Sequence, residues 1–96
     1  APLVPGAEQR VGSLLYIEDN EVNVLLVREL LALRPGVALH VAADGQTGVT
    51  LARELRPDLV LVDMHLPDFD GHEVLRRLRS DPLTAGLRCV ALSANA

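Results

Sequence analysis

Acidic side chains follow two apolar segments of this sequence, at the point where each segment ends. Asp63 comes directly after the apolar run 59–62, and Glu18 and Asp19 come directly after residues 14–17. Crowded carboxylates repel one another unless a hard cation lies between them, and Mg²⁺ favours such oxygen ligands. A carboxylate beside Mg²⁺ can also accept a phosphoryl group as an aspartyl phosphate. These residues therefore predict a magnesium site at which a carboxylate could accept a phosphoryl group.

A hydroxyl group follows a third apolar segment. Ser93 comes after residues 88–92, and its hydroxyl could stabilise charge on the oxygens of a transferring phosphoryl group. The acidic residues also have a plainer structural interpretation. Asp63 could cap the loop after its strand, and Glu18 and Asp19 could offset the dipole of the following helix.

The chemistry depends on elements that bring these residues to one place. Short apolar runs predict strands at 13–17, 58–63 and 88–92, and partial alternation of apolar residues predicts one at 37–42. Apolar residues at spacings of three and four predict helices at about 21–33, from 45 to just before Pro57, and at about 71–80. Strands that alternate with helices form parallel sheets with helices on both faces. Because the carboxyl ends of parallel strands share one edge, the acidic residues and Ser93 are expected to meet there.

Helical spacing also indicates which side chains should pack on the sheet. They are Val22, Leu25, Leu26, Leu30 and Leu33 in the first helix, Val49, Ala52 and Leu55 in the second, and Val74, Leu75 and Leu78 in the third. Asp70 is expected to cap the third helix and, with Glu73, to come close to a capping box.

Composition limits the classes of function. The chain has 96 residues, of which 49% are hydrophobic and 2% aromatic, and a net charge of -4. All nine basic residues are Arg and no basic stripe is present, which argues against nucleic-acid binding. The single Cys and the lack of a membrane-length apolar run or signal peptide favour a cytoplasmic domain. Residues 1–12 are rich in Pro and Gly and are expected to form a linker or tail.

Four motifs in order carry a family resemblance. They are Glu18-Asp19, the strand-end Asp63, the loop Asp-Met-His-Leu-Pro-Asp-Phe-Asp-Gly at 63–71, and Ala-Leu-Ser-Ala at 91–94. Together they resemble the receiver domain of bacterial two-component response regulators, over residues 13–96. The stretch 18–23 is further similar to receivers attached to hybrid histidine kinases.

The resemblance implies an α/β fold with a flavodoxin-like, doubly wound parallel sheet in the order 2-1-3-4-5. It implies Asp63 as the phosphoacceptor of a signalling domain that receives its phosphoryl group from a histidine kinase or a histidine phosphotransfer domain. Mg²⁺ would be held by Asp19, Asp63 and the backbone carbonyl of His65, with Glu18 acting through water.

Four residues match further functional positions of the family. Ser93 and Ala94 match the switch and phosphate-binding positions. His65 and Asn95 match positions that flank the path of the attacking water, and are expected to tune dephosphorylation. The domain is expected to be regulatory rather than an enzyme.

The sequence also departs from the family. Receivers continue with another helix, a fifth strand that ends in a phosphate-pairing Lys, and a fifth helix, whereas this sequence contains no Lys. Residues 13–96 are therefore expected to form an incomplete receiver, with strand order 2-1-3-4. Two outcomes are expected: either the protein continues beyond Ala96, or the uncovered strand 88–92 pairs or exchanges with a second copy of the chain.

Two alternative functions remain, and the missing Lys favours the first of them. The chain could be a receiver-like interaction module that is never phosphorylated. It could also be a magnesium-dependent aspartyl-phosphate hydrolase, although such enzymes usually carry an Asp-x-Asp pair and His65 stands at the second position here.

Overall fold

Four parallel strands form the sheet that carries the acidic residues. The computed structural model describes residues 12–92. Its strands are β1 (Gly12–Ile17), β2 (Val37–Ala42), β3 (Leu59–Asp63) and β4 (Cys89–Leu92). They lie in the order β2-β1-β3-β4, and every neighbouring pair is parallel. The predicted flavodoxin-like order 2-1-3-4 is confirmed, with strand bounds that differ from the prediction by no more than one residue.

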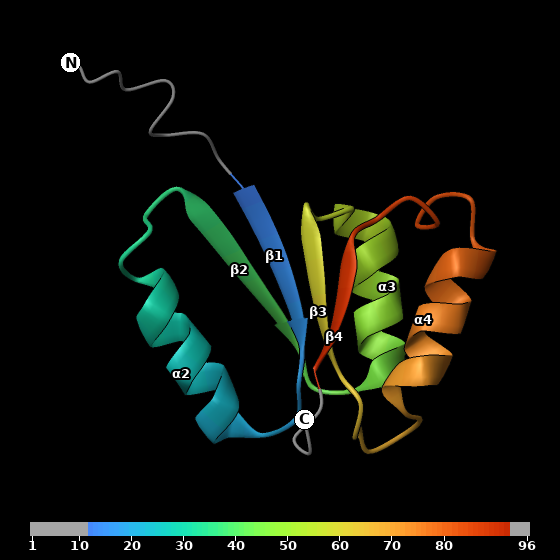
Figure 1. Ribbon diagram of the computed structural model, residues 1–96, viewed down its shortest axis with the longest axis horizontal. Coiled ribbons are helices and arrows are strands. Elements are labelled where there is room, and N and C mark those ends of the chain that lie inside the picture. The colour runs from blue at the N-terminus through green and yellow to red at the C-terminus, as the bar shows by residue number, and fades with distance from the viewer. Residues whose placement is uncertain (1–11, 93–96) are drawn as a thin grey trace.

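Three helices connect the strands: α2 (Glu21–Leu31), α3 (Gly45–Leu55) and α4 (Gly71–Ser80). Helices α3 and α4 lie side by side on one face of the sheet, and α2 lies on the other side, next to β2 (Figure 1). No helix within residues 12–92 is both long and apolar enough to cross a membrane.

Each helix begins at a polar side chain that accepts hydrogen bonds from its first turn. Asn20 accepts from the backbone N–H of Val22, Asp44 from that of Thr47, and Asp70 from that of Glu73. These caps satisfy donors that have no partner within a helix. The predicted cap at Asp70 is confirmed. The side chain of Glu73 does not complete a capping box but pairs with the arginines of its own helix.

The core lies between the sheet and the helix pair α3 and α4. It consists of Leu15, Ile17, Ala42, Ala52, Val60, Val62, Val74 and Leu78. Helix α3 approaches the sheet closely at Gly48, where a β-carbon would clash with the side chain of Ile17. Most of the predicted packing residues of α3 and α4 contact this core, but the prediction for Leu55 is wrong. Leu55 is 40% exposed because it ends α3, just before the left-handed residue Arg56.

The predicted buried face of the first helix is also wrong. No residue of α2 is buried. Its predicted packing residues, together with Leu33, have exposed fractions between 56% and 77%. The helix also ends at Leu31 rather than near residue 33. The half-buried residues of α2 are instead Val24, Val27 and Leu31, so the spacing identified apolar residues but not the side of the helix that is partly covered.

Candidate functional site

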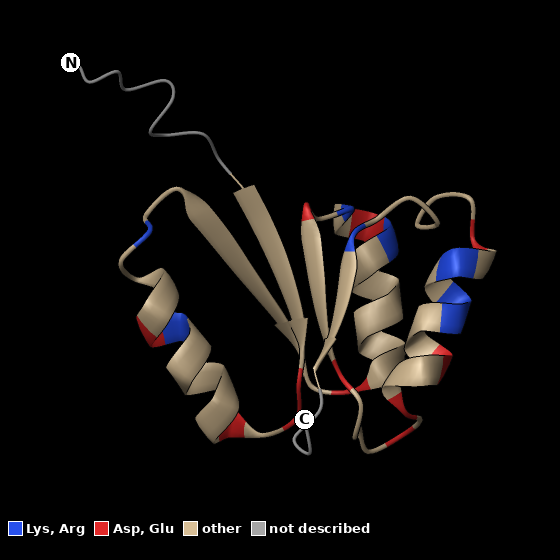
Figure 2. Ribbon diagram, in the orientation of Figure 1, with Lys and Arg blue, Asp and Glu red and all other residues tan. Residues whose placement is uncertain are grey.

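Three carboxylates meet at the carboxyl ends of two neighbouring strands. Glu18 and Asp19 follow β1, and Asp63 ends β3, which pairs with β1. One oxygen of each side chain lies within 4.8 Å of the others. Figure 2 shows acidic residues gathered at this end of the sheet. The structure thus brings together the three acidic residues that the sequence singled out.

Glu18 is held by donors from its own part of the chain. Its side chain is buried. Oε1 accepts hydrogen bonds from the Tyr16 hydroxyl at 3.1 Å and from Nδ2 of Asn23 at 3.3 Å, and Oε2 accepts one from the backbone N–H of Asn20 at 3.1 Å. Burial raises the pKa of Tyr16 to about 12, and the hydrogen bond from Tyr16 to Glu18 and the charges of Glu18 and Asp63 act in the same direction. The phenol therefore remains a donor to the carboxylate.

Sequence reasoning missed Tyr16 and Asn23. A usable signal was present for Tyr16, because residues two apart on a strand face the same side, which places its ring beside Glu18. Asn23 lies in the first turn of α2, where its side chain can turn back toward the preceding loop.

A cleft opens beside the three carboxylates. Its volume is about 390 Å³, and its lining consists of Glu18, Asp19, Asn20, Asn23, Asp63 and His65. Each water in the liquid occupies about 30 Å³, so a cation with several waters fits. The three carboxylates offer hard oxygen atoms as metal ligands, which suit Mg²⁺ and not a soft metal.

The loop after Asp63 is tied back to that residue. The backbone N–H of His65 donates to Oδ1 of Asp63 at 3.2 Å, and the N–H of Gly71 donates to the carbonyl of Met64 at 3.2 Å. A β-carbon at Gly71 would clash with the Met64 side chain and the Asp63 carbonyl. Only glycine allows α4 to begin this close to the end of β3.

Comparison with protein families identifies the fold and its class of function. Residues 14–96 match the model of the response regulator receiver domain. The chain belongs to this family. Receiver domains are regulatory domains of two-component signalling systems, and their fold is the flavodoxin-like sheet described above.

Curated relatives agree with this assignment. The receiver is 37% identical over 82 residues to the polar-differentiation response regulator DivK of Brucella anthropi, covering 85% of this chain and 66% of DivK. It is 46% identical over 67 residues to the transcriptional regulatory protein AfsQ1 of Streptomyces coelicolor, covering 70% of this chain but 29% of AfsQ1. The receiver thus spans at most about two thirds of the length of these relatives.

A solved structure of another receiver domain has the same fold. The receiver superimposes on the receiver domain of the sensor histidine kinase PA1611 from Pseudomonas aeruginosa with a TM-score of 0.83 and 32% identity. The match covers 90% of this chain and 70% of that one, whose structure has a magnesium ion coordinated in the active-site cleft. The acidic cluster of this receiver is consistent with the same ion.

Three of the predicted site residues follow the end of β4. Ser93, Ala94 and Asn95 lie outside the described residues. The last described residue, Leu92, pairs with Asp63, and the backbone N–H of Met64 donates to its carbonyl at 3.1 Å. The described part of β4 therefore ends directly beside Asp63.

Proposed function

We propose that Asp63 accepts a phosphoryl group and that its phosphorylation switches the interactions of this receiver with partner proteins. The observation that carries the proposal is the cluster of Glu18, Asp19 and Asp63, with Asp63 on a rigid strand end at the edge of a cleft. The phosphoryl donor is a histidine kinase or a histidine phosphotransfer domain. The receiver itself serves as a cytoplasmic regulatory domain and not as an enzyme.

In the proposed transfer, an Asp63 oxygen forms a bond to phosphorus while the phosphorus–nitrogen bond of a phosphohistidine breaks. The electron pair of that bond stays on the imidazole nitrogen. Asp19, Asp63 and the backbone carbonyl of His65 would hold Mg²⁺, and Glu18 would act through water. When bound, Mg²⁺ supplies positive charge that neutralises the carboxylates and the phosphoryl oxygens. Ser93 and Ala94 would contact the phosphoryl group and act as the switch residues.

The proposal is tested with Mg²⁺ and acetyl phosphate. Intact mass measurements should show one added phosphoryl group, and Asp63→Asn should abolish it because the amide lacks the nucleophilic oxygen. Asp58→Asn is the matched control, since Asp58 precedes the same strand at the opposite end, where it accepts from Ser13. Label on the Asp63→Asn protein would place the acceptor elsewhere. No label on the wild type would favour the unphosphorylated interaction module, and turnover of phosphate esters would favour a hydrolase.

His65 and Asn95 are proposed to set the lifetime of the phosphoryl group. His65 is exposed and lines the cleft beside Asp63, so its side chain can alter the access of water to the aspartyl phosphate. Exchanging both residues for the pair found in another receiver should change the dephosphorylation rate several-fold, measured as loss of the added mass over time. An unchanged rate would contradict these roles.

A further inference from the structure

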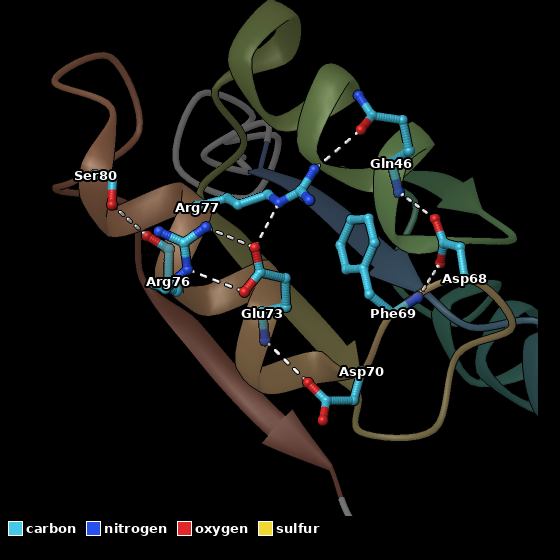
Figure 3. Close-up of polar contacts among 8 residues, drawn as sticks. All are labelled: Gln46, Asp68, Phe69, Asp70, Glu73, Arg76, Arg77 and Ser80. Carbon is cyan, nitrogen blue, oxygen red and sulfur yellow. Dashed lines mark hydrogen bonds and ion pairs between the residues drawn. The ribbon is translucent and has the colours of Figure 1, made fainter.

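The loop between β3 and α4 is bound to a helix that lies elsewhere in the sequence. Asp68, in this loop, accepts hydrogen bonds from the first turn of α3: Oδ1 from the backbone N–H of Gly45 at 2.8 Å, and Oδ2 from that of Gln46 at 2.9 Å. Oδ1 also accepts from the N–H of Phe69 at 2.9 Å. Figure 3 shows the carboxylate of Asp68 lying between the two segments.

A second set of contacts joins the same segments. The guanidinium carbon of Arg77 on α4 lies 4.1 Å from the centre of the Phe69 ring, and its Nη1 donates to Oε1 of Gln46 at 3.1 Å (Figure 3). The ring of Phe69 also packs on Gly45 so closely that a β-carbon there would clash with it. The loop is therefore fixed to α3 by a carboxylate on one side and by an aromatic ring on the other.

Capping of α3 alone does not account for Asp68. The helix already has its own cap, because Oδ1 of Asp44 accepts from the backbone N–H of Thr47 at 2.7 Å. In this first turn, Asp44 accepts from the backbone N–H of Thr47, and Asp68 accepts from those of Gly45 and Gln46. Only Asp68 connects those donors to the segment that carries His65, which lies three residues before it. Desolvation raises the pKa of Asp68, but its backbone donors outweigh this and lower the pKa below its ordinary value, so the carboxylate stays charged.

We propose that Asp68 is a positioning residue of the acidic site: by binding the loop to α3, it holds the backbone of His65 in place beside Asp63. The metal part of this inference rests on the proposed function, in which the His65 carbonyl is a ligand of Mg²⁺. Residues that orient metal ligands without touching the metal commonly control affinity. The same hydrogen bonds connect the site to α3, so a movement of the loop should also move the first turn of that helix.

The experiment compares Asp68→Ala with Asp44→Ala, since each removes one carboxylate from the same helix turn. The first readout is amide hydrogen exchange at Gly71 in metal-free protein, because its N–H donates to Met64 inside the loop. The second is the dissociation constant for Mg²⁺. Asp68→Ala should speed exchange at Gly71 and raise the dissociation constant by about tenfold. Asp44→Ala should change neither, and Asp68→Asn, which keeps one acceptor oxygen, should fall between Asp68→Ala and the wild type.

Two results would overturn the inference. Equal effects of Asp68→Ala and Asp44→Ala would reduce Asp68 to a helix cap, and unchanged exchange at Gly71 in both Asp68 variants would show that the loop does not depend on it. A wild-type protein that binds no Mg²⁺ would contradict the proposed function instead. In that case the metal-free exchange measurement alone decides whether Asp68 positions the loop.

Discussion

The acidic residues of the site differ in how they can coordinate a cation. The oxygens of Glu18 already accept three hydrogen bonds from the protein, so a cation must displace these donors or bind through water. Asp19 is exposed and lies beside Asp63. We therefore propose, as the family resemblance implies, that Asp19 is a direct ligand of Mg²⁺ and Glu18 an indirect one.

We expect Asp19→Asn to weaken Mg²⁺ binding at least about tenfold, because an amide oxygen carries no net charge. Binding at a hundred times the dissociation constant stabilises a protein by about 2.7 kcal/mol, so Mg²⁺ should raise the melting temperature of the wild type more than that of the variant. Without metal, Asp19→Asn should have a higher melting temperature than the wild type, since the substitution relieves repulsion among three carboxylates. Asp58→Asn is the control, and identical Mg²⁺ titrations of wild type and Asp19→Asn would refute the assignment.

At the scale of the elements, helix α4 contains two ion pairs that share one carboxylate. Glu73 pairs with Arg76 at 2.6 Å, one turn along, and with Arg77 at 2.8 Å. Hydrogen bonds from Arg76 and then Arg77 lower the pKa of Glu73 to about 2, against an ordinary value of 4.5. Both pairs are partly exposed, so salt will weaken them. Arg77 also lies over Phe69, which connects the charges of α4 to the loop beside the site.

The pKa of Glu73 gives α4 a defined dependence on pH. A carboxylate with a lowered pKa stabilises the folded state above its unfolded pKa, and this stability is lost as the pH falls toward the folded value. We therefore expect Glu73→Gln to lower the melting temperature at pH 7, with a difference from the wild type that shrinks between pH 4.5 and about 2. Glu54→Gln, an exposed change on α3, controls for the loss of one charge. A difference that stays constant over this range would disprove the role of the ion pairs.

Local sequence patterns predicted most elements, and long-range contacts account for what they missed. The strand at 58–63 follows from the unbroken apolar run 59–62, and the strand at 37–42 from partial alternation of apolar residues. Helix α4 follows from its cap at Asp70 and the spacing of Val74 and Leu78. The bond from Asp68 to Gly45 joins residues 23 apart, and no local pattern reveals it. The acidic cluster was predictable because parallel topology alone brings the strand ends together.

At the scale of the whole molecule, the described residues leave apolar side chains uncovered at both edges of the sheet. On α2 they form an apolar stripe of Val22, Leu25, Leu26 and Leu30. On β4 they are Val90 and Leu92, which are 44% and 38% exposed. The outer edge of β4 has no strand partner within residues 12–92. Residues 89–92 contain no charge and no proline, the usual features that keep an edge strand from pairing. An apolar surface of this kind favours association.

We therefore predict that a polypeptide of these 96 residues self-associates through β4. Sedimentation velocity should show a dimer or larger species whose share grows with concentration. Val90→Lys places a charge on the edge strand and should shift the protein toward monomer. Leu83→Lys is the matched control, because Leu83 is 49% exposed but lies in the segment between α4 and β4. A stable monomer of the wild type at high concentration would contradict the prediction. Loss of association in Leu26→Lys but not in Val90→Lys would instead place the contact on the apolar stripe of α2.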